Sequence, residues 1–598
     1  MCGICGELRF DGGAASARAI EAMSHVMQPR GPDAGGLMLH DSVGFGHRRL
    51  RIIDLSVRGS QPMHDPDLGL TLAFNGCIYN YRELKRELEG KGYRFFSNSD
   101  TEVILKAFAA WGRACVEHFN GMFAFAIYEH DNGRVTLARD RLGIKPLYLA
   151  EPNVEAAAPG QILRFASSLP ALLAAGDTDT SINPVALHHY MTFHAVVPPP
   201  HTIIKGVRKL PPATVAVIEA DGTRKDHVYW RPSFERTADD LAVSAGDWEE
   251  RVRDALMRAV KRRMVADVPV GVLLSGGVDS SLIVGLLAEA GQQDLKTFSV
   301  GFETVGGEEG NEFQYSDLIA KHYATDHHKI QVPTDEMIGA LPATIHAMSE
   351  PMVSHDNVGF FLLSREVKKH VRVVQSGQGA DEIFGGYHWY PPLANSNADV
   401  RDYRAAFFDR DHAEFQQAVS SEYCDATDYS FDFVADHFAI PGATSAVDRA
   451  LRIDTQIMLA DDPVKRVDNM TMAWGLEARV PFLDHELVEL VATIPAEHKL
   501  KHDGKGVLKD VARKIIPAEV IDRPKGYFPV PALKYIEGPV WTMVNDALTS
   551  QAAQNRGIFR QNYVDMLLEA PRDHITRLRG SKLWQIALLE LWLQSHRI

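Results

Sequence analysis

The run Val270-Gly271-Val272-Leu273-Leu274, followed at once by Ser275-Gly276-Gly277-Val278-Asp279-Ser280-Ser281, decides the fold of the second half of this chain. A short apolar run, a glycine turn, a helical pattern over 280–290 and a second β-rich run at 297–301 predict a βαβ unit of a parallel sheet. Glycines let the backbone approach an anion, and a helix N-terminus supplies free N–H donors. The turn is therefore predicted to bind phosphate.

An ordinary glycine-rich turn would also explain two glycines alone. Three serine hydroxyls add donors to this turn, and Asp279 adds an oxygen ligand suited to magnesium. The turn differs from a Walker loop because no Gly-Lys-Ser/Thr follows. A second motif, SGQGADEIFGGY at 376–387, follows the strand predicted at 371–375 and offers Asp381 as a second carboxylate.

The first half of the chain has a different pattern. Short β-rich runs at 70–74, 124–128 and 134–138 alternate with turns and with helical stretches at 81–89 and 101–111, which predicts a layered α+β domain. An acidic, polar segment at 234–246 is typical of a linker, and the chain ends in a helix-rich tail. The expected divisions are a first domain at 2–195, a connecting segment at 196–246, a second domain at 247–540 and a helical C-terminal extension at 541–598.

The N-terminus carries a candidate nucleophile. Removal of Met1 would leave Cys2 with its own α-amino group as a base, because the pKa of such an amine is about 8. Cys2 and Cys5 also form a C-x-x-C, which suits zinc or redox chemistry. The other three cysteines are isolated, so a four-ligand zinc site cannot be assembled, and Cys5 is expected to be a small apolar core residue.

Composition narrows the function classes. The chain has 598 residues, 45% hydrophobic and 24% charged, which is typical of an ordinary protein of two to four domains. A formal charge of -15 disfavours a nucleic-acid partner, and there is no apolar run long enough for a bilayer. Five cysteines favour a reducing compartment. We therefore expect a cytoplasmic protein that acts on small molecules, without nucleic-acid or membrane partners.

Together these motifs resemble those of the glutamine-hydrolysing asparagine synthetase family, and the resemblance covers nearly the whole chain. It implies an N-terminal αββα Ntn-hydrolase-type sandwich, which is a class II glutamine amidotransferase domain. It also implies a C-terminal parallel-sheet α/β domain of the ATP pyrophosphatase (adenine nucleotide α-hydrolase-like) type, with a helical tail. The family often forms dimers, so a homodimer is possible. Further matching motifs are RGPD at 30–33, NGCIYN at 75–80, GMFAF at 121–125, DRLGIKPLY at 140–148 and EARVPFLD at 477–484.

For the first domain, the resemblance implies glutamine hydrolysis. Cys2 would attack the side-chain amide, and Asn75 with the Gly76 N–H would stabilise the oxyanion. Arg49 and Asp100 match the positions that bind the carboxylate and ammonium of glutamine; without the motifs they would be an exposed strand arginine and a helix cap. The implied glutamine-binding set is Arg49, Leu50, Ile52, Ile53, Asn75, Gly76, Cys77 and Asp100.

For the second domain, the resemblance implies that ATP adenylates a carboxylate, which ammonia then attacks. Asp279 and Asp381 would hold Mg²⁺, Lys505 would neutralise phosphate charge, and Glu350 would be a base for incoming ammonium. A shielded passage for ammonia, lined partly by apolar and small residues, is expected between the domains. The implied ATP-binding set is Leu274, Ser275, Gly276, Gly277, Asp279, Ser280, Val300, Ser376, Gly377 and Lys525.

Three positions depart from the family pattern. Cys77 replaces a glutamate of the glutamine pocket, so Asp100 would bind the ammonium alone. Gln378 and Ser354 replace carboxylates of the acceptor pocket, which indicates an acceptor whose amine is absent or blocked. The chain resembles the N-acetylglutaminylglutamine amidotransferase branch, which makes an osmoprotectant. The alternatives are asparagine biosynthesis from aspartate, a non-catalytic regulatory homologue, and glutamine hydrolysis alone.

Overall fold

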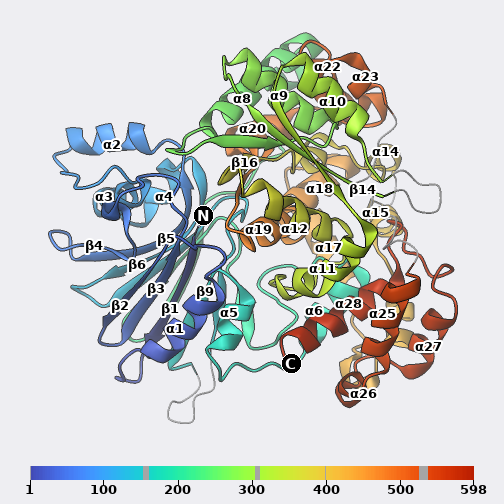
Figure 1. Cartoon of the computed structure of the whole chain (residues 1–598), viewed down its shortest axis with the longest axis horizontal. Helices are drawn as coiled ribbons and strands as arrows, with labels where there is room; N and C mark the ends of the chain where they lie inside the picture. Colours follow the sequence, from blue (N-terminus) through green and yellow to red (C-terminus); the bar gives the residue numbers. More distant parts are fainter. Residues whose placement is uncertain (1, 152–159, 304–309, 397–398, 524–535) are drawn as a thin grey trace.

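The computed structural model describes residues 2–151, 160–303, 310–396, 399–523 and 536–598. In the first half, two six-stranded antiparallel sheets lie face to face (Figure 1). The strand order is β10-β8-β9-β1-β3-β2 in one sheet and β12-β11-β7-β6-β5-β4 in the other. The strands are β1 (Gly3–Arg9), β2 (Ala34–His40), β3 (Val43–Arg49), β4 (Met63–Asp65), β5 (Leu70–Ile78), β6 (Gly121–Glu129), β7 (Arg134–Arg139), β8 (Tyr148–Ala150), β9 (Ile162–Ala166), β10 (Val207–Lys209), β11 (Thr214–Ile218) and β12 (Arg224–Val228).

Helices cover the outer faces of these sheets. One sheet is covered by α1 (Ala17–Val26) and α5 (Leu169–Ala174), and the other by α2 (Tyr81–Gly90) and α3 (Asp100–Trp111). Apolar side chains of both sheets fill the space between them, since alternate residues of a strand point to one face. Ile4, Phe45, Ala124 and Phe165 are fully buried there. This is the αββα sandwich that the resemblance implies. Strands β10 to β12 belong to these sheets, although they lie in the segment 196–246.

The second half is built on a five-stranded parallel sheet with the order β15-β14-β13-β16-β17. Its strands are β13 (Val270–Leu273), β14 (Lys296–Phe302), β15 (Asp326–Val332), β16 (Val373–Gln375) and β17 (Glu477–Arg479). Helices lie on both faces of the sheet, as a right-handed parallel connection requires (Figure 1). They include α8 (Ala245–Arg262), α9 (Val278–Glu289), α10 (Phe313–His322), α11 (Thr334–His346), α12 (Asp356–Val367), α19 (Lys465–Met472), α20 (His485–Thr493) and α22 (Gly506–Ala512).

The C-terminal helices pack on this domain. Helix α28 (Lys582–Ser595) contacts α11 and α25 (Gly538–Thr549), and most of its side chains are buried. Helix α28 also contacts α6 (Pro184–Thr192), which precedes the parallel-sheet domain in the chain. The OH of Tyr190 on α6 donates to the carbonyl of Gln585 on α28 at 2.7 Å. The other helices of this region are α15 (Asp399–Phe407), α16 (His412–Ala418), α17 (Tyr429–Ala439), α18 (Ala446–Ile453), α26 (Gln551–Arg556) and α27 (Gln561–Glu569).

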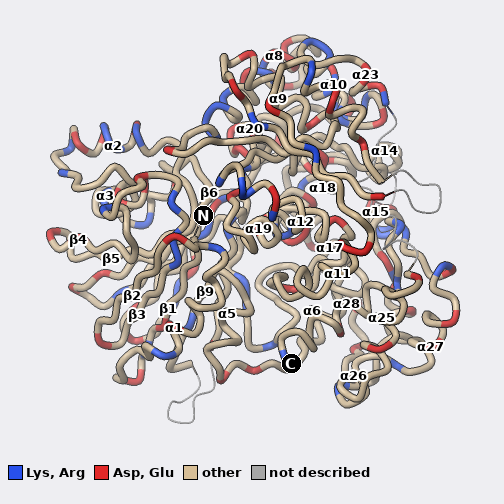
Figure 2. Tube along the Cα trace, in the orientation of Figure 1, with Lys and Arg blue, Asp and Glu red and all other residues tan. Residues whose placement is uncertain are grey.

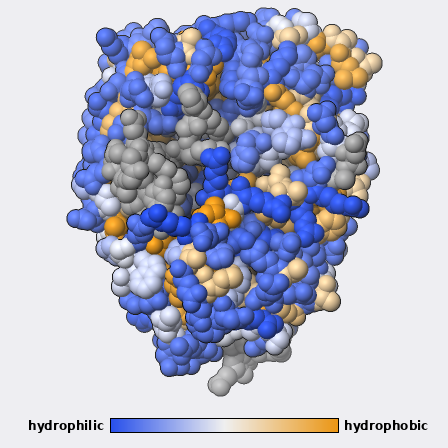
Figure 3. All heavy atoms as spheres, turned by 90° about the vertical axis from the view of Figure 1, so that its right-hand side faces the viewer, coloured by the Kyte–Doolittle hydropathy of each residue, from blue (hydrophilic) through white to orange (hydrophobic). Residues whose placement is uncertain are grey.

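Charged residues of both signs are interspersed over both halves of the chain (Figure 2). The face in Figure 3 is mostly hydrophilic, with the hydrophobic residues in small groups. Among the described residues, no helix combines the length and the apolar character needed to cross a membrane.

Candidate functional site

Two cavities contain most of the predicted site residues. The first, here called the Cys2 cavity, opens where β1 begins, and the Cys2 side chain is buried in it. Every residue of the predicted glutamine-binding set except Asn75 lines this cavity. The lining residues are Cys2, Arg49, Leu50, Ile52, Ile53, Gly59, Gln61, Phe74, Gly76, Cys77, Ser99, Asp100, Thr101, Glu477 and Arg479.

Asn75 lies directly beside the nucleophile. The Cys2 backbone N–H donates to Asn75 Oδ1 at 3.1 Å. The Asn75 side-chain amide nitrogen is buried and has no hydrogen-bond partner among the described residues. The next residue must be small, because a Cβ on Gly76 would lie 2.1 Å from the Met122 carbonyl. A buried N–H donor beside a thiol suits the stabilisation of an oxyanion formed by attack of the sulfur.

The charged residues of the Cys2 cavity are held in place by backbone groups. Arg49 is buried and donates to the carbonyls of Asp54 at 2.5 Å and Ser56 at 2.9 Å, so it is not an exposed strand arginine. Asp100 is the first residue of α3, whose cap is Ser99, and its carboxylate accepts from the Ile78 N–H at 3.1 Å. Burial raises the pKa of Asp100 to about 6.

Glu477 and Arg479 belong to the EARVPFLD motif at 477–484, and the sequence alone predicts no role for them at the site. They form β17 at the edge of the parallel sheet, and both line the Cys2 cavity of the other domain. Arg479 Nε donates to Glu477 Oε1 at 2.6 Å, and Arg479 Nη2 donates to Cys77 Sγ at 3.6 Å. The signal in the sequence is the presence of two opposite charges in a short β-rich run that has to be buried.

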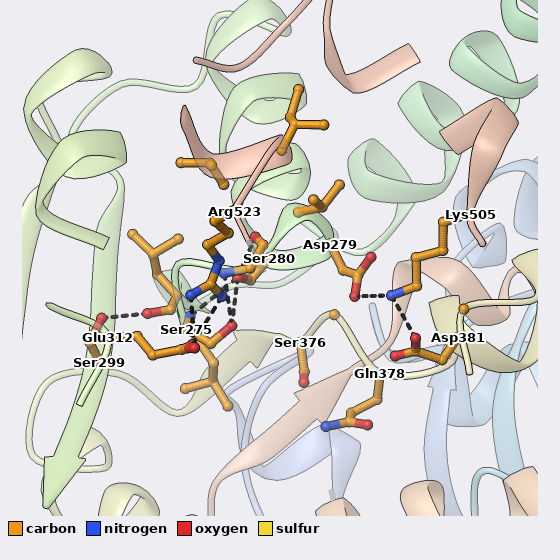
Figure 4. A pocket seen from close by; sticks show the side chains of 18 of the residues that line it. Ser275, Asp279, Ser280, Ser299, Glu312, Ser376, Gln378, Asp381, Lys505 and Arg523 are labelled. Carbon is orange, nitrogen blue, oxygen red and sulfur yellow. Dashed lines mark hydrogen bonds and ion pairs between the residues drawn. The ribbon is translucent and has the colours of Figure 1, made fainter. Parts of the chain in front are cut away.

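The second cavity, here called the Ser275 cavity, has a volume of about 670 Å³ and lies at the carboxyl ends of β13, β14 and β16. This is where open parallel sheets bind ligands. Ser275, Asp279 and Ser280, from the turn before α9 and its first residues, line the cavity (Figure 4). Of the predicted ATP-binding and metal residues, the cavity is lined by Leu274, Ser275, Gly277, Asp279, Ser280, Val300, Ser376, Gly377 and Asp381; Lys505 also lines it.

The turn itself explains the need for glycine. Gly276 has φ of 78°, and a Cβ there would lie 2.8 Å from the Ser316 nitrogen. The Ser275 N–H donates to Ser280 Oγ at 3.2 Å, and the Gly277 N–H donates to Ser275 Oγ at 3.3 Å. These contacts shape the turn around the start of α9, whose first N–H groups have no partner within the helix.

Asp279 and Asp381 come from different loops and converge on one cation. Lys505 Nζ lies 2.7 Å from Asp279 Oδ2 and 2.9 Å from Asp381 Oδ1 (Figure 4). Although burial opposes its charge, these two carboxylates raise the pKa of Lys505 above its usual value. The donor set, two carboxylates facing a phosphate-type loop, fits Mg²⁺.

Several predicted residues lie elsewhere. Gln378 lines the Ser275 cavity, but Ser354 and Glu350 do not. Lys525 lies outside the described residues. A neighbouring residue that sequence reasoning did not assign, Arg523, lines the cavity, and its guanidinium donates to both carboxylate oxygens of Glu312, at 2.7 and 3.0 Å.

Glu350 lies instead at the contact between the two domains. Its Oε1 accepts from the OH of Tyr148 at 3.3 Å and lies 3.2 Å from Lys209 Nζ. Its Oε2 is buried and has no hydrogen-bond partner among the described residues. Tyr148 and Lys209 belong to the first domain, and both line a small cavity together with Asp461 and Lys465 of the second.

Buried charges extend from Glu350 toward Cys2. Asp468 on α19 pairs with Arg30 at 2.9 Å and with Lys145 at 3.1 Å, and Arg30 Nε donates to the Cys2 carbonyl at 3.4 Å. The small cavity at this contact is lined by paired charged side chains and also by the small or apolar residues Gly143, Ile144, Pro146 and Ala460. The passage itself stays a prediction.

Comparison with known proteins agrees with this geometry. The family model for the glutamine amidotransferase domain matches residues 1–230, and the model for asparagine synthase matches residues 251–594. The chain is 32% identical to asparagine synthetase [glutamine-hydrolyzing] 1 of Bacillus subtilis, over 99% of this chain and 96% of that protein. It is 29% identical to asparagine synthetase B [glutamine-hydrolyzing] of Escherichia coli, over 88% of this chain and 82% of that protein.

A sandwich domain with a buried N-terminal cysteine, followed by a parallel-sheet domain with a phosphate-type loop, defines a two-domain ligase with glutamine as its nitrogen donor. The chain belongs to the glutamine-hydrolysing asparagine synthetase family. The expectation drawn from the sequence motifs is confirmed at the level of family, fold class and type of enzyme.

Proposed function

We propose that this enzyme amidates an acylated dipeptide, N-acetylglutaminylglutamine, with ammonia from glutamine and energy from ATP. The observation that carries the choice of acceptor is Gln378 in the Ser275 cavity, where the family pattern has a glutamate. Of the acids that line this cavity, Asp356 lies 3.6 Å from the guanidinium of Arg466, so its charge is opposed. A pocket with few unopposed anions favours an acceptor without an ammonium group.

In the first half-reaction, the Cys2 thiolate attacks the side-chain amide carbon of glutamine. The α-amine that is exposed once Met1 is removed takes the proton from the Cys2 thiol and passes it to the nitrogen that leaves. The Asn75 amide and the Gly76 N–H stabilise the oxyanion, and collapse of the tetrahedral species expels ammonia and leaves a thioester. Water then hydrolyses the thioester to glutamate. Arg49 and Asp100 hold the carboxylate and ammonium of the donor, and Leu50, Ile52, Ile53 and Cys77 complete its pocket.

In the second half-reaction, the acceptor carboxylate attacks the α-phosphorus of ATP, which forms an acyl adenylate and releases pyrophosphate. The Ser275 turn binds phosphate oxygens, and Lys505 neutralises their developing charge. Asp279 and Asp381 would hold Mg²⁺, which would supply positive charge to the phosphates. Ammonia then displaces AMP and gives the amide. Glu350 takes the proton of any ammonium that reaches the domain contact.

The direct test supplies ATP, Mg²⁺ and glutamine with either N-acetylglutaminylglutamine or aspartate, and measures pyrophosphate release. The dipeptide is expected to raise the rate at least about tenfold over aspartate, because aspartate brings an α-ammonium without an anionic partner. Aspartate is the second candidate, favoured by the names of the relatives. A response to aspartate alone would overturn the proposed acceptor. Absence of AMP with both acceptors would favour glutamine hydrolysis alone.

A further inference from the structure

The Cys2 cavity draws its acidic side chains from both domains. Position 77, where the family has a glutamate, is a cysteine, and the acids among the lining residues are Asp100 of the first domain and Glu477 of the second. Free glutamine carries one ammonium and one carboxylate. Binding that ammonium in a buried site requires anionic partners, since an unpaired buried charge is costly.

Glu477 is held where it meets the cavity. Its side chain is buried, and Arg479 Nε donates to Oε1 at 2.6 Å. Arg479 is itself fixed by the carbonyls of Arg263 at 2.8 Å and Val265 at 2.7 Å. The parallel pairing of β17 with β16 fixes the register of β17, with Glu477 opposite Val373. The carboxylate is thus oriented before a ligand arrives.

Two acids, Asp100 and Glu477, and two arginines, Arg49 and Arg479, line the Cys2 cavity. Asp100 and Glu477 line the same cavity, and the Glu477 charge adds to the effect of burial in raising the pKa of Asp100. Arg479 pairs with Glu477 and donates to Cys77 Sγ, and Arg49 donates to backbone carbonyls. Although burial opposes its charge, nearby cations that include Arg479 lower the pKa of Glu477 to about 2, so this carboxylate is ionised and can accept from an ammonium.

We propose that Glu477 of the second domain, together with Asp100, binds the α-ammonium of the donor glutamine. Glu477 thus supplies from the second domain a carboxylate that position 77, a cysteine, does not supply from the first. The donor site is then complete only when the two domains are docked, so glutamine capture depends on β17. The inference rests on the proposed glutamine hydrolysis at Cys2.

The test compares glutamine with glutaramate, which is glutamine without its α-amino group. In Glu477→Gln, we expect KM for glutamine to rise about tenfold, with a small change in kcat, because an ion-pair contact to the substrate is lost. Hydrolysis of glutaramate should keep its kcat/KM within about twofold. Cys77→Glu in the Glu477→Gln background should restore most of the affinity for glutamine.

Equal losses for glutamine and glutaramate would show that Glu477 only maintains the shape of the cavity, and would overturn the inference. An unchanged KM for glutamine would overturn it as well. Glu497→Gln, an exposed acid in the same domain, is the matched control and should behave as the unmodified enzyme. If the unmodified enzyme released no glutamate at all, the proposed function would fail instead, so the two failures are distinct.

Discussion

Lys505 occupies the point on which two carboxylates converge, and its backbone is adapted to that position. Its φ and ψ of 58° and 29° are left-handed, which costs a residue with a Cβ about 1–3 kcal/mol. The cost is met by ion pairs to Asp279 and Asp381. A lysine in a strained backbone conformation, between two acids and beside a phosphate-type turn, indicates that its positive charge acts on bound phosphate and that packing is not its role.

Replacement of Lys505 by methionine keeps the length of the side chain and removes its charge. We expect AMP and pyrophosphate formation to fall about 100-fold, because a donor aimed at developing negative charge contributes about 3 kcal/mol. Glutamate release from glutamine, measured in the same samples, should continue. AMP formation within twofold of the unmodified rate would contradict the proposed role.

Asp100 predicts a pH dependence of glutamine binding. Its pKa is raised to about 6, above the value of about 3.9 for an unfolded aspartate, so the folded protein keeps the proton longer. Its contribution to stability therefore falls as the pH rises between these values. Only the ionised form attracts an ammonium. Affinity for glutamine should increase about tenfold per pH unit below 6 and level off above it.

Calorimetric titration of Cys2→Ala protein with glutamine, between about pH 5 and 7.5, measures this dependence without turnover. The Asp100→Asn change in the same background should bind glutamine weakly at every pH. A binding curve that stays flat with Asp100 present would show that this carboxyl does not titrate in contact with the ligand.

At the scale of elements, α19 links the two domains through buried ion pairs. Asp468 takes two cations of the first domain, Arg30 and Lys145, and all three side chains are buried. A carboxylate between two buried cations contributes more to the stability of the fold than a surface ion pair does, because its loss leaves both buried cations without a counter-charge. The helix is thus held against the segments that follow α1 and β7.

Asp468→Asn should therefore lower the free energy of unfolding by about 3–5 kcal/mol. Urea unfolding followed by circular dichroism measures it, with both transitions fitted if the domains unfold separately. Asp432→Asn, an exposed aspartate on α17, is the control and is expected to change stability by less than about 0.5 kcal/mol. Equal stability of the two variants would show that the pair is not structurally important.

At the scale of the whole molecule, the contact between the domains is the route that we predict for ammonia. Ala460 is a small buried residue in the cavity that also includes Tyr148 and Lys209. Ala460→Phe fills that space. We expect glutamate still to form, while the amount of amide product per glutamate falls at least about threefold, because ammonia escapes before it reaches the adenylate.

The ratio of product to glutamate is the measurement, and Ala552→Phe on the exposed side of α26 is the control. A ratio that stays at the unmodified value in Ala460→Phe would exclude this contact as the route. Added ammonium should restore product formation in Ala460→Phe if the second site is intact.

Local patterns predicted the elements well. The run 270–274 is β13 with one residue fewer, and the helix expected at 280–290 is α9, which begins at Val278. The helices at 81–89 and 101–111 lie within one residue of α2 and α3. Residues 234–246 include a short helix at Ala238–Ala242 and the start of α8, because Thr237 and Ser244 cap them.

Three signals act over only a few residues: the alternation of apolar residues, the glycines of turns and the caps of helices. The sequence alone therefore predicted the strands, the phosphate-type turn and the nucleophile at position 2. The contacts of Arg479 with Cys77, of Asp381 with Lys505 and of Glu350 with Lys209 came only from folding. Each joins segments far apart in the chain, and a buried charge finds its partner through the packing of whole domains, which no local pattern encodes.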